Sequence, residues 1–82
     1  MPVVLRRGGF RVRILFPPRE HPPPHVHVRK GNGSVVIELA TPTARQRIRE
    51  LREMSDRDVA EAFELVEEHT DFLLGYWRRH HG

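Results

Sequence analysis

The sequence predicts an α+β domain: an antiparallel sheet of four or five strands, built from two hairpins, with one long C-terminal helix packed on one face. In the first half of the chain, apolar and polar residues alternate in short runs separated by glycine-rich turns, which indicates hairpins. In the last third, apolar residues recur with helical spacing. The 82 residues suffice for one domain, residues 1–82, with no room for a second.

The first hairpin is predicted around Gly8-Gly9, between Val3–Arg7 and residues 10–16. In the second run, apolar residues at every other position alternate with Arg11 and Arg13, which is typical of a strand with one buried face. In this hairpin Arg6 is expected directly opposite Arg11.

A proline-rich loop is predicted at residues 17–24, where five prolines flank Arg19-Glu20-His21. Proline lacks the N–H group that a central strand needs, so this segment is expected to be stiff and exposed. It would hold Glu20 and His21 at the margin of the sheet.

A second hairpin is predicted between His25–Lys30 and residues 35–39. A two-residue turn at Asn32-Gly33 keeps the apolar residues on one face, whereas a three-residue loop would put them on both. This register places His27 opposite Glu38.

Residues 40–54 are the hardest to interpret. Thr41-Pro42-Thr43 indicates a turn, and residues 46–51 fit an edge strand or a short helix, of which the strand is favoured. Ser55 then resembles a helix N-cap with acidic residues in the first turn, and the helix is expected to run to about Arg79. Its apolar stripe consists of Val59, Ala62, Phe63, Val66, Leu73, Tyr76 and Trp77.

Charge is distributed unevenly along the chain. Residues 1–30 carry seven Arg or Lys and one Glu, a net +6, whereas residues 31–82 carry seven Arg and ten acids, a net −3. A basic first half is a cue for a polyanion or an acidic protein partner. The absence of cysteine excludes thiolate chemistry and, with no signal-peptide or membrane-spanning run, predicts a cytoplasmic protein with no membrane partner.

Strand alternation predicts a cationic sheet face opposite the helix. Its residues are Arg6, Arg11, Arg13, His25, His27, Arg29 and Glu38. Opposed arginines destabilise a sheet, and a bound phosphate would relieve the repulsion because arginine offers paired donors. The sharpest hypothesis is RNA cleavage without a metal or other cofactor, catalysed by His25 and His27 with Glu38 orienting an imidazole. The arginines, with His21 and Glu20 at the margin, would bind the substrate.

Three other interpretations stay open, and so does the question of whether the chain is an enzyme. The His/Arg face could simply keep the domain soluble. It could dock a small acidic partner protein without catalysis, or take part in a homodimer. His25 and His27, with His21 or Glu20, also have the spacing of an open metal site, although the neighbouring arginines would repel a cation.

The motifs carry a resemblance that covers nearly the whole chain. They are Glu20-His21-Pro22-Pro23-Pro24-His25-Val26-His27-Val28, Gly8-Gly9-Phe10, Glu67-Glu68-His69 and Trp77. The chain thereby resembles a family of small bacterial proteins known only as a domain of unknown function. The resemblance implies a component of a two-gene toxin–antitoxin-type module, which favours RNA or a small cognate protein as the partner, and it implies no established catalytic residues.

Overall fold

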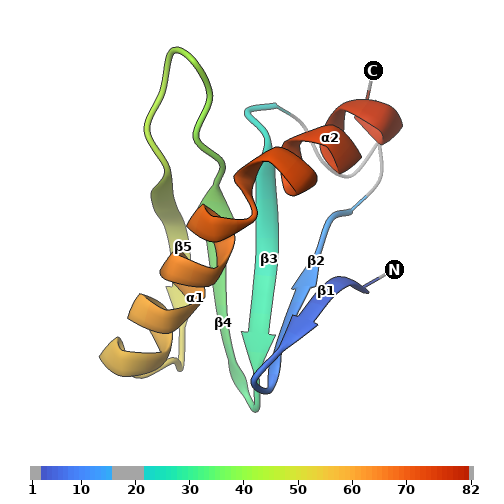
Figure 1. The fold of residues 1–82 in the computed structure, drawn as a ribbon. Helices are drawn as coiled ribbons and strands as arrows, with labels where there is room; N and C mark the ends of the chain where they lie inside the picture. Colours follow the sequence, from blue (N-terminus) through green and yellow to red (C-terminus); the bar gives the residue numbers. More distant parts are fainter. Residues whose placement is uncertain (1–2, 16–21, 82) are drawn as a thin grey trace.

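The computed structural model describes residues 3–15 and 22–81, which form five strands and two helices (Figure 1). The elements are β1 (Val3–Arg7), β2 (Phe10–Arg13), β3 (His25–Lys30), β4 (Gly33–Glu38), β5 (Arg47–Arg52), α1 (Asp56–Glu68) and α2 (Thr70–His81). The strands make one antiparallel sheet in the order β1-β2-β3-β4-β5, as the α+β prediction required. Both helices cover the same face of the sheet (Figure 1). Neither is long and apolar enough to cross a bilayer.

The first hairpin has the predicted turn. Gly8 and Gly9 both have positive φ, 55° and 84°, and Arg6 lies opposite Arg11. Strand β2 ends at Arg13, earlier than expected, although the next residue, Ile14, is still fully buried. Phe16 lies outside the described residues.

The predicted register of the second hairpin is wrong by two residues. The turn is Gly31-Asn32, so that Lys30 pairs with Gly33 and His25, rather than His27, lies opposite Glu38. Gly31 has φ +58°, which suits the first central position of this turn. Gly33 belongs to β4, and a larger residue would not fit there because its Cβ would lie 2.5 Å from the carbonyl oxygen of Glu53. A shift of two residues preserves the alternation of positions between the two faces of the sheet.

The edge strand predicted near residues 46–51 is confirmed as β5, and all six of its residues are exposed. A bulge interrupts its pairing with β4: Val36 lies opposite Glu50, but Ile37 lies opposite Ile48. The extra residue in β5 is Arg49, and the bulge changes how the side chains alternate along this edge.

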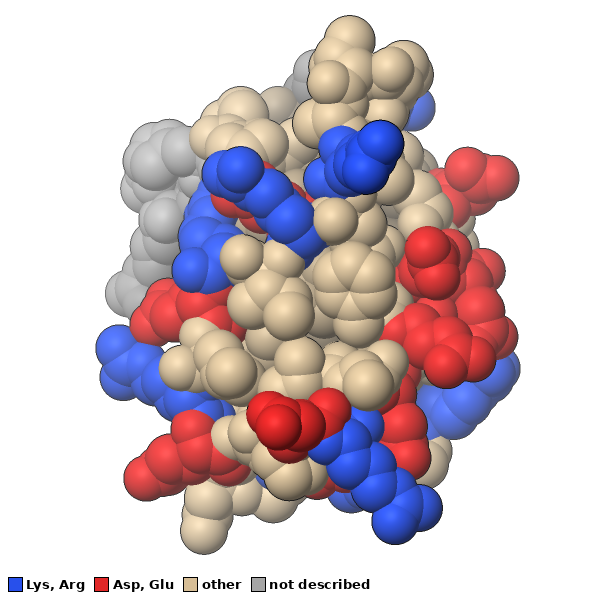
Figure 2. All heavy atoms as spheres, turned by 90° about the vertical axis from the view of Figure 1, so that its left-hand side faces the viewer, with Lys and Arg blue, Asp and Glu red and all other residues tan. Residues whose placement is uncertain are grey.

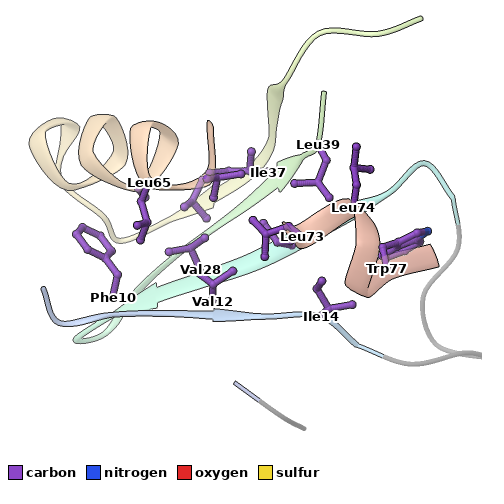
Figure 3. Packing of buried hydrophobic residues seen from close by; sticks show 14 residues of the cluster. Phe10, Val12, Ile14, Val28, Ile37, Leu39, Leu65, Leu73, Leu74 and Trp77 are labelled. Atoms are coloured by element: carbon purple, nitrogen blue, oxygen red, sulfur yellow. The ribbon is translucent and has the colours of Figure 1, made fainter. Parts of the chain in front are cut away.

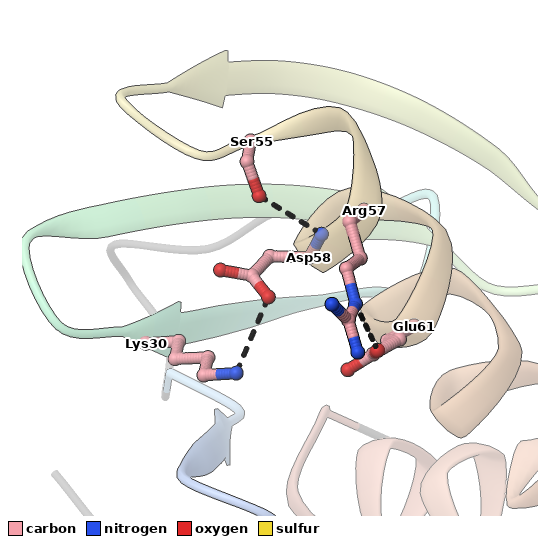
Figure 4. Close-up of polar contacts among 5 residues, drawn as sticks. All are labelled: Lys30, Ser55, Arg57, Asp58 and Glu61. Atoms are coloured by element: carbon pink, nitrogen blue, oxygen red, sulfur yellow. Dashed lines mark hydrogen bonds and ion pairs between the residues drawn. The ribbon is translucent and has the colours of Figure 1, made fainter.

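The single long helix is the fold prediction that the structure corrects. The helix begins as expected, since the Ser55 hydroxyl accepts a hydrogen bond from the Asp58 N–H at 3.1 Å (Figure 4). It ends at Glu68 because His69 turns its own N–H to the Val66 carbonyl and donates from Nδ1 to the Leu65 carbonyl at 2.8 Å. This side-chain bond replaces the regular backbone bond to Leu65 and closes the helix. Helix α2 then starts in a new direction (Figure 1).

The core fills the space between the sheet and the two helices (Figure 3). Its buried residues are Phe10, Val12, Ile14, Val26, Val28, Val35, Ile37, Leu39, Ala62, Leu65, Val66, Leu73, Leu74 and Trp77. Leu65 and Leu74 also belong to it, whereas Phe63 and Tyr76 of the predicted stripe are only partly buried. The opposite side of the sheet, which we call the open face, is not covered by a helix in the described part of the chain (Figure 1).

Candidate functional site

The strand registers align charged side chains across the open face. Arg6 lies opposite Arg11, Arg11 opposite Arg29, Arg29 opposite Ser34, and Ser34 opposite Arg52. Directly opposed residues in antiparallel strands point to the same face, so these five residues form one row across all five strands. We call it the arginine row: Arg6, Arg11, Arg29, Ser34 and Arg52. It spans about 19 Å, because neighbouring strands lie about 4.8 Å apart.

A second row runs beside the first. Arg13 of β2 lies opposite His27 of β3, which lies opposite Val36 of β4, and Val36 faces Glu50 of β5. Arg13 is half-buried, and its Nε is buried without a hydrogen-bond partner among the described residues. His27 is therefore flanked by a cation on one side and an apolar residue on the other.

A concavity of about 740 Å³ opens over the β3 to β5 part of these rows. It is lined by His27, Arg29, Asn32, Ser34, Val35, Val36, Glu50, Arg52 and Glu53. Arg52 and Glu50 form an ion pair at 2.9 Å on its wall, between two exposed side chains. Exposed pairs of this kind contribute only about 0.2–1 kcal/mol, so Arg52 can exchange the carboxylate for another anion at little cost.

His25 is buried rather than exposed, which corrects its predicted place on the cationic surface. It is 1% exposed, and its ring lies 5.1 Å from the Trp77 ring of α2 and 5.5 Å from the His27 ring. Its Nδ1 donates to the Pro23 carbonyl at 2.9 Å, because a carbonyl oxygen can only accept. His25 therefore fixes the start of β3 against α2.

The same aromatic cluster also holds the end of the preceding segment. Trp77 stacks on His81 with ring centroids 3.6 Å apart, and His81 donates from Nε2 to the Leu15 carbonyl at 2.8 Å. Leu15 is thus held directly by α2, and Pro23 is held by His25, whose ring lies against Trp77 of α2. Glu20 and His21, the predicted marginal residues of the site, lie outside the described residues.

Glu38 is paired with two arginines, so its predicted pairing with His27 is wrong. Arg47 donates from Nε to Oε1 and Arg49 donates from Nε to Oε2, each at 2.8 Å. The side chain of Glu38 is 11% exposed. The hydrogen bond from Arg49 and, after it, that from Arg47 hold the pKa of Glu38 below its ordinary 4.5, although burial opposes them. The carboxylate is thus committed to an ion pair that joins β4 to β5.

Sequence reasoning missed Arg47, Arg49 and Arg52. All three lie on β5, whose register against β4 depends on a bulge that no local pattern announces. One sequence signal pointed to them: arginines alternate at positions 45, 47 and 49. Such alternation fits a strand that pairs with the strand carrying the single acid Glu38.

The described residues contain no group of three His, Asp or Glu side chains arranged to hold a metal ion. His25 and His27 do lie close to each other, and the further ligands expected from Glu20 and His21 are outside the described part of the chain.

Comparison with known proteins gives one result. No curated protein and no solved structure matches the chain. The family model described as a domain of unknown function, DUF4160, matches residues 9–78, from the first hairpin turn to the last turn of α2. Because this span is most of the chain, the protein belongs to the DUF4160 family, and the expected membership in a family of small domains of unknown function is confirmed.

Proposed function

We propose that this protein is the RNA-binding component of a two-gene toxin–antitoxin-type module, and that it binds RNA through the open face without cleaving it. The arginine row is the observation that carries the proposal. Arg11 has Arg6 on one side and Arg29 on the other, each directly opposite it. Opposed like charges destabilise a sheet. A bound polyanion would neutralise them and so offset this cost.

Binding is favoured over cleavage by the positions of the three expected catalytic residues. Acid–base cleavage of RNA needs one group to remove a proton and another to supply one, both in reach of the substrate. His25 is buried in the aromatic cluster, and Glu38 is held by Arg47 and Arg49. Only His27 lines the concavity.

The open face also favours contact with phosphates over recognition of bases. Its described part carries no Phe, Tyr or Trp: Phe10 and Trp77 belong to the core, Phe63 and Tyr76 pack against the core, and Phe72 lies on α2. Stacking on aromatic rings is the usual source of base affinity for single strands. The arginine row therefore supports salt-dependent binding with little sequence preference.

The cellular setting is also part of this proposal. The cytoplasmic location is inferred from the lack of cysteine, and the cognate protein encoded by a neighbouring gene is what the family resemblance of the motifs at residues 8–10, 20–28, 67–69 and 77 implies. From the second we expect that the partner protein, when bound, changes the access of RNA to the arginine row.

The test is binding of a labelled single-stranded RNA, measured by fluorescence anisotropy at several salt concentrations. Four arginines that contact phosphates give a slope of log affinity against log salt of about −3, since each contact adds about −0.7 for a single strand. The double variant Arg11→Gln, Arg29→Gln is expected to bind at least about tenfold more weakly with a slope near −1.5. Arg57→Gln, Arg78→Gln removes the same charge from exposed helix positions and is the matched control.

Two results would overturn the proposal. One is RNA binding that the double variant leaves at the level of the control, and the other is no binding even at low salt. Gel analysis of the same RNA, with chelator and with His27→Ala, tests the noncleaving part. Cleavage that disappears in His27→Ala would show an enzyme instead.

A further inference from the structure

A groove of about 640 Å³ lies between β5 and α1, on the helix side of the sheet and away from the arginine row. Its apolar residues are Ile48, Val59, Ala60 and Phe63, and its carboxylates are Asp56, Glu64, Glu67 and Glu68. Figure 2 looks onto this side of the molecule and shows uncharged surface down the middle, with a large group of carboxylates on the right and further charged residues of both signs on the left and at the bottom. The groove is apolar inside and acidic at its rim.

Ile48 of β5 lines the groove, and β5 is an edge strand with two exposed large apolar side chains, of which Leu51 lies beyond the groove lining. Ile48 is 42% exposed and Leu51 is 47% exposed, and each lies opposite a core residue of β4, Ile37 and Val35 respectively. Both therefore point to the helix side. Exposed large apolar residues close together mark a site of interaction.

The bulge in β5 keeps charge away from this wall. Arg49 bonds to Glu38 on the open face, and Glu50 lines the concavity there. Two consecutive charged residues thus share the open face, which leaves only Ile48 and Leu51 of residues 48–51 on the helix side. In the described part of the chain β5 pairs with β4 alone, so its outer edge still has backbone N–H and C=O groups to offer.

The charge of the rim decides which occupant fits. If a second copy paired its β5 with this one, two carboxylate rims would lie on the same face of the joined sheet, on either side of the junction. Four acids on each side would repel each other. A basic segment would meet attraction along the whole of α1.

We propose that this groove binds a basic, extended segment of a partner protein, which adds to β5 as a sixth strand. Alternate apolar side chains of the segment cover Ile48, Leu51 and Phe63, and its Lys or Arg side chains reach the carboxylates of α1. The inference goes beyond the RNA-binding proposal, because the groove and the arginine row lie on opposite sides of the sheet. Both sites can be occupied at once.

A synthetic peptide tests the groove directly. The probe is a fluorescent peptide of about nine residues that alternates lysine with valine or leucine, as β-strand addition requires. The triple variant Glu64→Gln, Glu67→Gln, Glu68→Gln is expected to bind it at least about tenfold more weakly than the unaltered protein. Ile48→Ser is expected to weaken binding about fivefold. Hydrogen exchange should show new protection in β5 when the peptide is bound.

Matched controls distinguish binding in the groove from nonspecific binding of the peptide to the protein surface. Glu61→Gln lies on α1 outside the groove, and Phe72→Ser removes an apolar side chain that is 52% exposed on α2. Neither should change the affinity. A peptide with glutamate in place of lysine, or with a central proline, should not bind, because proline cannot donate to a strand edge.

The proposal is overturned if the triple variant binds the peptide as well as the unaltered protein, or if the proline peptide binds equally well. It is also overturned if sedimentation shows a dimer that Ile48→Ser dissociates, since a second copy would then occupy β5. The variant Arg11→Gln, Arg29→Gln should keep full peptide affinity, so failure of this proposal and failure of the RNA-binding proposal are distinguished.

Discussion

The two faces of this sheet place their side chains for different physical reasons. On the face under the helices, Val12, Val28 and Ile37 are fully buried, and each removes apolar surface from water. On the open face, Arg11 and Arg29 oppose each other across β2 and β3, an arrangement that lowers stability when nothing is bound. Folding alone thus explains the first face, whereas we propose that a bound ligand explains the second.

The largest expected loss of stability comes from a substitution on the face of the sheet that the helices cover. Leu73→Ala removes a fully buried side chain between α2 and the sheet, where the surrounding core cannot collapse to fill the space (Figure 3). We expect the free energy of unfolding to fall by about 3 kcal/mol. Urea denaturation followed by circular dichroism measures it. In a domain this small, such a loss removes much of the stability.

Leu51→Ala is the matched control, because it is the same change at a position that is 47% exposed on the edge strand. It should cost less than about 1 kcal/mol. Equal losses at Leu51 and Leu73 would contradict the packing described for α2.

The next largest loss of stability is expected at the β3–β4 turn, which sets the register between these two strands. In Gly33→Ala the new Cβ would lie 2.5 Å from the Glu53 carbonyl oxygen and 3.0 Å from the Met54 Cβ. Backbone must move to make room, so we expect a loss of about 2 kcal/mol in thermal or urea unfolding. Gly75→Ala, in an exposed helix position with nothing within 4 Å, should instead raise stability by about 0.5–1 kcal/mol. If Gly33→Ala left the free energy of unfolding unchanged, the close approach of Gly33 to the Glu53 carbonyl would be contradicted.

A smaller loss of stability is expected on substitution of Glu38, which links β4 to β5 on the open face. Glu38→Gln weakens the bonds with Arg49 and Arg47 and should cost about 1.5 kcal/mol at pH 7. Because the folded-state pKa of Glu38 lies below its ordinary 4.5, the carboxylate contributes fully above that pH. Its contribution is lost as the pH falls through the lower folded-state value.

Urea unfolding of the unaltered protein and of Glu38→Gln, at a series of pH values from neutral downward, checks the pH dependence. The gap between the two should narrow once the pH falls below 4.5. If the difference in unfolding free energy between the two proteins stays constant with pH, the arginines do not stabilise Glu38 through its charge.

The fold could be predicted from sequence wherever a local pattern decides it. Alternation assigned the strands to residues and their side chains to faces, and the Ser55 cap located the start of α1. Two features depended on contacts that are distant in sequence or on side-chain detail. The close approach of the Glu53 carbonyl to Gly33 is a contact between residues 20 positions apart, and α1 ends at Glu68 because the His69 imidazole donates to the Leu65 carbonyl.

The site was predictable in part for the same reason. Alternation assigned Arg6, Arg11 and Arg29 to one face, and a register shift of two residues could not change this. The partner of an individual residue is more sensitive, so the shift gave Glu38 a different neighbour. Burial of His25 depends on Trp77, which is 52 residues away and beyond the helix break.

The last prediction is the sharpest test of the comparison between faces, because removing a charged side chain from the open face should not lower the free energy of unfolding. Arg11→Gln removes the charge that faces both Arg6 and Arg29, so the free energy of unfolding should stay constant or rise by about 0.5 kcal/mol at low salt. Salt at about 1 M should abolish the gain by screening the repulsion. Arg57→Gln, which breaks the 3.3 Å pair with Glu61, should instead lose about 0.3 kcal/mol (Figure 4).

Urea unfolding of these variants at low and high salt, beside their RNA affinities, gives the decisive pair of numbers. Substituting a residue that serves binding lowers the RNA affinity of the protein without lowering its stability, whereas substituting a residue that serves folding lowers the stability. If Arg11→Gln destabilises the protein more than Arg57→Gln does, the arginine row is part of the scaffold. The argument that a ligand explains the row would then fail, even if RNA still bound.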